Sequence, residues 1–273
     1  MKELETIEIA HKAFHTKGSR PLLVTCNDFQ DWVCKYDRTA LNLFNEVLAS
    51  KFAATWGINT PEIAFINVKK EHVPPDRFPK IPTHLFDKVC FGSLYLNNSK
   101  EIDETIIPMF YDAATRRHLH QKEDFLKIAL FDLWLANEDR HHNNYNLLLH
   151  TSPEKYTFFY AIDHVQIFNS TFLDYGIAEL TEDESLIKTE IAKVLFKDRK
   201  ELIRTVDNII ENFYLCSDKC RNSLDEILDL VPPSWEINTN EIRERIDNQV
   251  FSKEWLKNCE QQFRELIKIF IEN

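Results

Sequence analysis

The sequence lacks any run of apolar residues long enough to cross a bilayer. A transmembrane helix needs about 18 or more consecutive apolar residues, and no segment approaches that length. Residues 1–10 are acidic and strand-like, without the basic stretch and apolar run that mark a secretory signal. We therefore expect neither a membrane span nor a signal peptide, and we expect a cytoplasmic location.

Positive charge is also scarce. The chain has 33 Lys and Arg against 44 Asp and Glu, a net charge of −11. Affinity for nucleic-acid backbones comes from clustered Lys and Arg, so direct nucleic-acid binding is not expected. A single nucleotide remains compatible with this balance, because one local lysine and a metal ion can hold its phosphates.

The six cysteines lack the neighbours that a zinc site needs. Cys216 and Cys220 are one helical turn apart, but no second cysteine pair or histidine group follows them. A chain of this length without a secretory signal is expected to keep its thiols reduced.

Aromatic residues are abundant, with 20 Phe, 8 Tyr and 5 Trp, and 44% of all residues are hydrophobic. Disordered chains have few of both. The composition therefore predicts a large buried core, in one large domain or in two lobes around a cleft.

The first third of the chain predicts strands around one helix. Alternating or apolar runs indicate strands at residues 5–10, 22–26, 32–36, 63–68 and 91–96. Between residues 39 and 56 apolar residues recur every three or four positions, which predicts a helix that Gly57 ends. Residues 74–82 are rich in proline and predict a surface connection, and residues 97–100 are a polar stretch.

The remainder is mainly helical. An apolar helix is predicted at about residues 122–136, followed by a polar loop over 137–144. Residues 146–150 and 156–162, joined by a turn at 152–155, predict a β-hairpin. The last hundred residues predict amphipathic helices, clearest between Trp255 and Phe270. The expected division is a strand-rich part at 1–97 and a helical part at 98–273.

The polar loop and the end of the hairpin carry the residues with chemical potential. Asp139 is followed five residues later by Asn144, so one short loop can present both side chains to the same side. The hairpin then returns the chain to Asp163. Phosphoryl transfer needs a carboxylate beside the attacking hydroxyl and oxygen ligands for Mg²⁺, and these three residues supply them.

This order resembles the catalytic loop and metal-binding Asp of protein-kinase-like enzymes. The pattern Asn-x-Asp-Arg-x-x-x-Asn-x-Asn at 137–146, followed by Ile-Asp-His at 162–164, resembles the HipA-like kinases, particularly their short stand-alone branch. The looser pattern is also similar to phosphatidylinositol kinases. Weaker similarities at 32–36, 44–49, 56–61 and 230–235 extend the resemblance over most of the chain.

The resemblance implies an α+β, bilobal protein-kinase-like fold. A small β-rich N-terminal lobe with one helix, residues 1–97, would bind nucleotide. A larger, mainly helical C-terminal lobe, residues 98–273, would carry the catalytic hairpin. The cofactors would be ATP and Mg²⁺, and the acceptor a hydroxyl group, by default Ser or Thr of a protein. The resemblance also implies a bacterial toxin or regulatory role with a partner or antitoxin protein.

Residue roles follow from the same resemblance. Asp139 would be the catalytic base or hydroxyl-orienting carboxylate, and Asn144 and Asp163 would bind Mg²⁺. Lys35 would hold phosphates and pair with Glu46, the only acid between Arg38 and Pro61. The adenine would lie near residues 94–97.

The phosphate-covering loop departs from the pattern. Such loops are rich in glycine, so that backbone N–H groups approach the phosphates closely. Here only Gly18 and Ser19 stand in that place, and the whole chain has 4 glycines.

Plainer interpretations remain open. Lys35 can be an exposed edge residue, Glu46 can lie on a solvated helix face, and the loop asparagines can serve turns. His141 and His142 lack the spacing of a zinc site. The glycine-poor loop leaves a pseudokinase scaffold as an alternative, and Asp-Arg-His at 139–141 leaves a lipid or small-molecule kinase.

Overall fold

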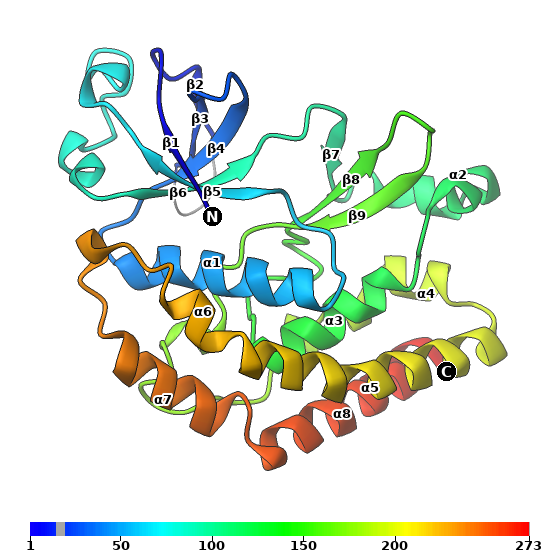
Figure 1. Ribbon diagram of the computed structural model, residues 1–273. Helices are drawn as coiled ribbons and strands as arrows, with labels where there is room; N and C mark the ends of the chain where they lie inside the picture. Colours follow the sequence, from blue (N-terminus) through cyan, green and yellow to red (C-terminus); the bar gives the residue numbers. More distant parts are fainter. Residues whose placement is uncertain (15–19, 273) are drawn as a thin grey trace.

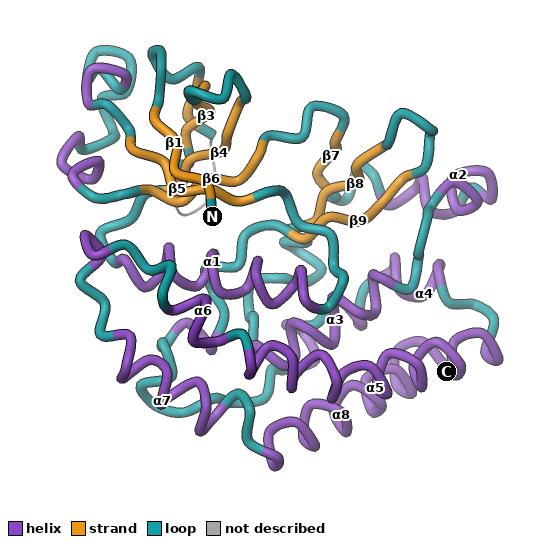
Figure 2. The backbone as a smooth tube through the Cα atoms, in the orientation of Figure 1, coloured by secondary structure: helices purple, strands orange, loops and turns teal. Residues whose placement is uncertain are grey.

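Two β-sheets lie on one side of the molecule and the long helices on the other (Figures 1 and 2). The computed structural model describes residues 1–14 and 20–272. The strands are β1 (Lys2–Glu5), β2 (Lys12–Ala13), β3 (Leu22–Thr25), β4 (Asp31–Lys35), β5 (Ile63–Asn67), β6 (Cys90–Leu94), β7 (Ser99–Glu101), β8 (Leu147–Thr151) and β9 (Thr157–Ala161).

The α-helices are α1 (Ala40–Thr55), α2 (Ala113–His118), α3 (Asp124–Leu135), α4 (Glu190–Leu195), α5 (Arg199–Asn222), α6 (Leu224–Leu228), α7 (Thr239–Gln249) and α8 (Lys253–Ile267). Short 3₁₀ turns connect several of them. No helix in the described part of the chain combines the length and apolar character needed to span a bilayer.

Strands β1 to β6 form one sheet in the order β1-β5-β6-β4-β3-β2. Only the β1–β5 pair is parallel. Phe65 and Phe91, which are paired across β5 and β6, join the core that contains α1. The opposite face packs against the segment between β5 and β6, where the covering residues are Val73, Phe78, Ile81 and Phe86.

Gly92 lets β6 lie close to Ile66 of β5. A Cβ atom at this position would be 2.3 Å from Cδ1 of Ile66, so glycine fits where a larger residue would force the neighbour to move.

The prediction of a first strand at residues 5–10 was wrong. The strand is β1, which ends at Glu5, and Leu4 is its buried residue. Ile7 and Ile9 are 41% and 43% exposed. The partner of β1 is β5, about sixty residues away, so local alternation could not fix its position.

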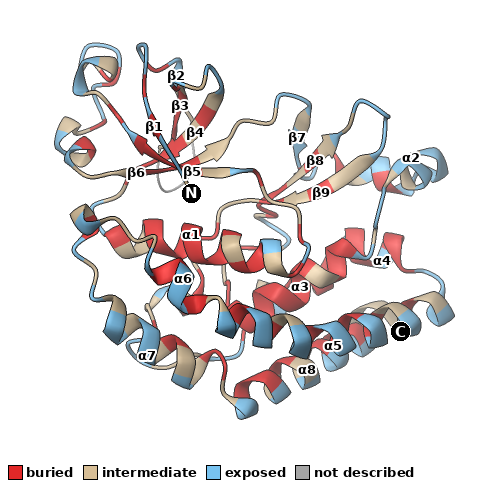
Figure 3. Cartoon of the chain, in the orientation of Figure 1, coloured by how far each residue is buried: buried red, intermediate tan, exposed pale blue. Residues whose placement is uncertain are grey.

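The helix predicted at residues 39–56 is α1. Gly57 follows it in the left-handed conformation, with φ of 65°, as expected at a helix C-terminus. Most of α1 is buried, because the six-stranded sheet lies on one side and the C-terminal helices on the other (Figure 3).

The predicted hairpin is present as β8 and β9, and a third strand, β7, pairs with β8. The polar stretch at 97–100 gave no strand signal, because the residues of β7 are mostly exposed and the strand is held by its backbone pairing.

One large apolar core joins α1, α3 and the C-terminal helices. Helix α3 is buried along nearly its whole length. Trp134 of α3 donates its indole N–H to the carbonyl of Val250 at 3.0 Å. Its own backbone carbonyl accepts a hydrogen bond from the indole N–H of Trp255 at 2.8 Å. The polar loop over residues 137–144 therefore begins at the end of a helix that is buried along nearly its whole length.

Candidate active site

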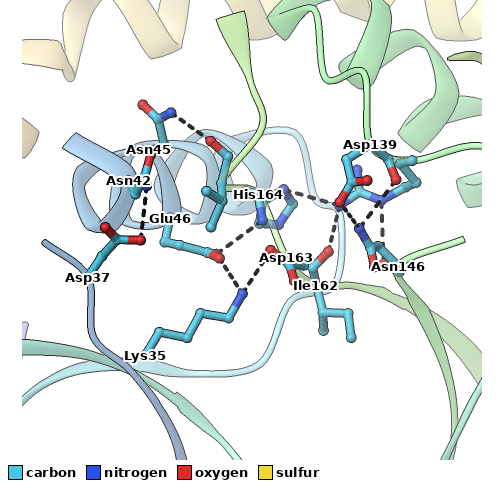
Figure 4. Close-up of polar contacts among 12 residues, drawn as sticks. Lys35, Asp37, Asn42, Asn45, Glu46, Asp139, Asn146, Ile162, Asp163 and His164 are labelled. Carbon is cyan, nitrogen blue, oxygen red and sulfur yellow. Dashed lines mark hydrogen bonds and ion pairs between the residues drawn. The ribbon is translucent and has the colours of Figure 1, made fainter. Parts of the chain in front are cut away.

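Three charged side chains from distant segments meet between the two sheets (Figure 4). Lys35 ends β4, Glu46 lies in the middle of α1, and Asp163 follows β9. The Lys35 ammonium forms an ion pair with the Glu46 carboxylate and lies 2.9 Å from Oδ1 of Asp163. The sheet, the helix and the hairpin are thus joined at one lysine.

The two carboxylates differ in how far their side chains are exposed to solvent. The Glu46 side chain is 2% exposed and that of Asp163 is 32% exposed. Asp163 is therefore the carboxylate that a bound molecule can reach, while Glu46 pairs with Lys35 from the buried side.

The electrostatics keep Lys35 and Asp163 charged. Burial lowers the pKa of Lys35, but the neighbouring Asp163 and Glu46 carboxylates outweigh it and raise this pKa above its ordinary value. Burial likewise raises the pKa of Asp163, but Lys35 outweighs it, so the pKa of Asp163 is below its ordinary value.

Helix α1 is also bonded to the segment after Asp163. Glu46 accepts a hydrogen bond from the backbone N–H of His164 at 3.2 Å, and Asn45 donates to the carbonyl of Val165 at 2.8 Å. The sequence gave no sign of the role of Asn45, which lies on a buried part of the helix.

The loop after α3 places Asp139 beside two asparagines. Asn146 donates to the Asp139 carboxylate at 3.2 Å, and Asn144 donates to the Asp139 carbonyl at 3.0 Å. Asn146 was part of the sequence pattern but had no predicted role. Its amide fixes the direction of the carboxylate on which the chemistry of the loop would depend.

Backbone pairing brings this loop next to Asp163. The N–H of Ile162 donates to the carbonyl of Asn146 at 3.0 Å, so the residue before Asp163 lies against the end of the loop. The structure therefore brings Asp139, Asn144 and Asp163 into one region, together with Lys35 and Glu46.

His164 is a buried neutral side chain. Burial lowers its pKa well below the ordinary value, and the nearby Arg140 and Lys35 lower it further. Its Nδ1 lies 3.2 Å from a guanidinium nitrogen of Arg140 and, in the neutral form, accepts that hydrogen bond.

The oxygen donors fit Mg²⁺. This ion binds through one or two protein oxygens together with phosphate oxygens and water, so it needs no cage of protein ligands. No cluster of three or more His, Cys, Asp or Glu suited to a metal occurs among residues 1–14 and 20–272. Asp163 offers a partly exposed carboxylate, and the amide nitrogen of Asn144 donates to the Asp139 carbonyl, so its oxygen is the atom that would bind a cation.

Two predicted elements of the site stay predictions. Gly18 and Ser19 lie outside the described residues. Residues 94–97 lie where β6 ends and the chain crosses to the second sheet, with the Tyr95 N–H bonded to the Asp31 carbonyl at 2.9 Å. Their contact with adenine is untested.

Comparison with known proteins assigns the family. A family model described as HipA-like kinase matches residues 6–267. A search among curated proteins returned no match.

One solved kinase structure shows the fold, and a second is reported for its similarity. The crystal structure of the Helicobacter pylori proinflammatory kinase CtkA is 13% identical in sequence, covers 94% of this chain and 98% of that chain, and gives a TM-score of 0.52. HipA of a Shewanella oneidensis toxin–antitoxin system, solved with HipB and operator DNA, is 10% identical over 92% of this chain and 68% of that chain, with a TM-score of 0.49. The predicted protein-kinase-like fold, with a sheet-rich N-terminal part and a helical C-terminal part, is confirmed.

Proposed function

Because the chain belongs to the HipA-like kinase family, we propose that it is an ATP- and Mg²⁺-dependent kinase whose acceptor is a serine or threonine hydroxyl of a protein. The observation that carries this proposal is the convergence of Lys35, Asp139 and Asp163 from three distant segments. Phosphoryl transfer depends mainly on positioning and on neutralising charge, and this arrangement suits both.

Each residue has a part in the proposed reaction. Lys35, held by Glu46, binds phosphate oxygens of ATP. Asp163 and the amide oxygen of Asn144 hold Mg²⁺, which would neutralise charge on the phosphates. Asp139, oriented by Asn146, accepts the hydrogen bond of the acceptor hydroxyl and directs its oxygen at the γ-phosphate.

The test uses purified protein with γ-labelled ATP and Mg²⁺, compared with Asp163→Asn, Asp139→Asn and the control Asp225→Asn. Asp225 pairs with Arg243 on the surface. We expect each site variant to lose about 100-fold or more of the transfer rate while remaining folded, and the control to keep it. Full activity in Asp163→Asn would refute the metal assignment.

The label also identifies the acceptor. Phosphoserine or phosphothreonine in protein supports the proposal, whereas label in lipid or in a small molecule would assign another class of kinase. A partner protein such as an antitoxin remains a prediction from family membership.

A pseudokinase is the second candidate, favoured by the single glycine between β2 and β3. A ligand that binds only the folded protein raises its melting temperature. A shift with MgATP but no label transfer to any acceptor would favour a nucleotide-binding scaffold, and no shift at all would favour a scaffold that binds no nucleotide.

A further inference from the structure

Arg140, the residue after Asp139, is fully buried and contacts four residues from three segments of the chain. Its guanidinium forms an ion pair with Asp132 of α3. Its Nε donates to the carbonyl of Asn146 at 3.4 Å. Its Nη2 donates to the carbonyl of Ile162 at 2.8 Å and to Nδ1 of His164 at 3.2 Å.

A buried ion pair of this kind is poor evidence for a purely stabilising role. Removing two charges from water costs several kcal/mol per ion, and well-packed apolar residues often replace such pairs without loss of stability. Asn137 shares Oδ1 of Asp132 with Arg140, while Oδ2 has no hydrogen-bond partner in the described part of the chain. The contacts that Arg140 makes beyond Asp132 are therefore the informative ones.

Two of these contacts flank Asp163. Ile162 and His164 are its immediate neighbours, and Asp163 itself has φ of 58°. Aspartate tolerates this left-handed conformation better than most residues other than glycine, and the contacts on both sides of Asp163 stabilise the turn. The turn directs the Asp163 carboxylate to Lys35, 2.9 Å away, instead of continuing the line of β9.

We propose that Arg140 is a positioning residue for the metal ion. It bonds both neighbours of Asp163 and the carbonyl of Asn146, and thereby fixes the position of the Asp163 carboxylate relative to the loop that carries Asp139. This inference rests on the proposed function. Arg140 touches neither phosphate nor metal, and acts through Asp163 and through the carbonyl of Asn146.

Lysine cannot replace it. The guanidinium is planar and reaches several acceptors at fixed angles, whereas an ammonium is a point charge on a flexible stem. Arg140→Lys keeps the charge beside Asp132 but cannot hold Ile162, His164 and Asn146 together.

The experiment measures Mn²⁺ binding to the full chain by electron paramagnetic resonance, with ADP present, for the wild type, Arg140→Lys and Arg243→Lys. Arg243 is the matched control, an arginine in an exposed ion pair. Loss of a residue that orients a metal ligand costs about 10- to 100-fold in metal affinity. We expect that loss in Arg140→Lys, no change in the control, and unchanged ADP binding without metal, since Lys35 and Glu46 are intact.

Each result is decisive. Wild-type Mn²⁺ affinity in folded Arg140→Lys overturns the inference, as does an equal loss of metal-free ADP binding, which would indicate general damage to the site. If Arg140→Lys does not fold, His164→Asn decides, because it removes one of the two flanking contacts and leaves the ion pair. A weaker Mn²⁺ affinity there supports the inference, and an unchanged one overturns it. Absence of Mn²⁺–ADP binding in the wild type would refute the proposed function itself.

Discussion

Asn146 orients the side chain of Asp139 by one hydrogen bond and does so from an unusual backbone conformation. Its φ is 46°, in the left-handed region where asparagine is tolerated better than most residues. The same residue therefore provides both the sharp exit from the loop and the amide that fixes the carboxylate at 3.2 Å.

Replacing Asn146 by glycine separates these two contributions. Glycine accepts the left-handed backbone but lacks the amide, so Asp139 loses its orientation while the loop keeps its course. A small misplacement of a reacting group can lower a rate by about 100-fold. We expect kcat of Asn146→Gly to fall by about that factor with little change in KM for ATP.

Steady-state kinetics of Asn146→Gly and Asn146→Ala give the comparison. Alanine adds backbone strain to the loss of the amide, so its melting temperature should be lower than that of the glycine variant. Wild-type kcat in Asn146→Gly would show that Asp139 needs no help from this amide.

The sequence predicted the charged residues of the candidate site more readily than the residues that contact and orient them. Lys35, Glu46, Asp139 and Asp163 could be predicted because the order of motifs along the chain is itself a signal. Asn45 bonds one distant carbonyl and Arg140 bonds several distant groups, and such contacts leave no periodic pattern in the sequence. Asp132 offered one hint, since a carboxylate inside an apolar helix requires a partner.

At the scale of elements, helix α1 connects the six-stranded sheet to the segment after Asp163. Glu46 and Asn45 are adjacent, and both bond to that segment, to the His164 N–H and the Val165 carbonyl. The position of the helix is therefore coupled to that of Asp163. A helix that shifted away would break the Lys35–Glu46 pair and the support of Asp163 together.

We expect Asn45→Ala to destabilise the protein more than Asn42→Ala. The Asn45 residue is 1% exposed, and its loss removes the donor to the Val165 carbonyl and leaves a gap in a buried part of the helix, which costs about 1–3 kcal/mol. Asn42 lies one turn earlier and bonds Asp37 in a part-buried position at the start of the helix. Urea unfolding measures both, and equal free energies of unfolding for the two variants would contradict the coupling.

Element prediction succeeded where the signal was local. The apolar repeat of α1, the amphipathic pattern of α8 and the hairpin of β8 and β9 agree with the structure to within a few residues. Strands β1 and β7 were misplaced or missed, since each is defined by a distant partner, β5 and β8. A single sequence does not show which distant segments pair with each other.

At the scale of the whole molecule, the core crosses the boundary that the sequence suggested at residue 97. Helix α1 precedes that boundary but belongs to the same apolar core as α3 and the C-terminal helices. Phe52 of α1 stacks on Trp134 of α3, with ring centroids 5.5 Å apart, and also packs on Phe251. The two parts of the chain are therefore separate in their sheets but joined in their core.

This shared core predicts that residues 98–273 do not fold alone. Without α1 the fragment would expose Trp134 and Phe251, and removing even one buried phenylalanine typically costs about 3–5 kcal/mol, comparable with the whole stability of a domain. We expect the intact chain to unfold in one cooperative calorimetric transition and the purified fragment to lack fixed tertiary structure by near-ultraviolet circular dichroism.

Two separate transitions, or a folded fragment, would mean that the C-terminal lobe is stable without α1. In that case the coupling between α1 and Asp163 would be an interface between lobes that can open, and nucleotide binding would then be expected to raise the melting temperature of the first transition alone.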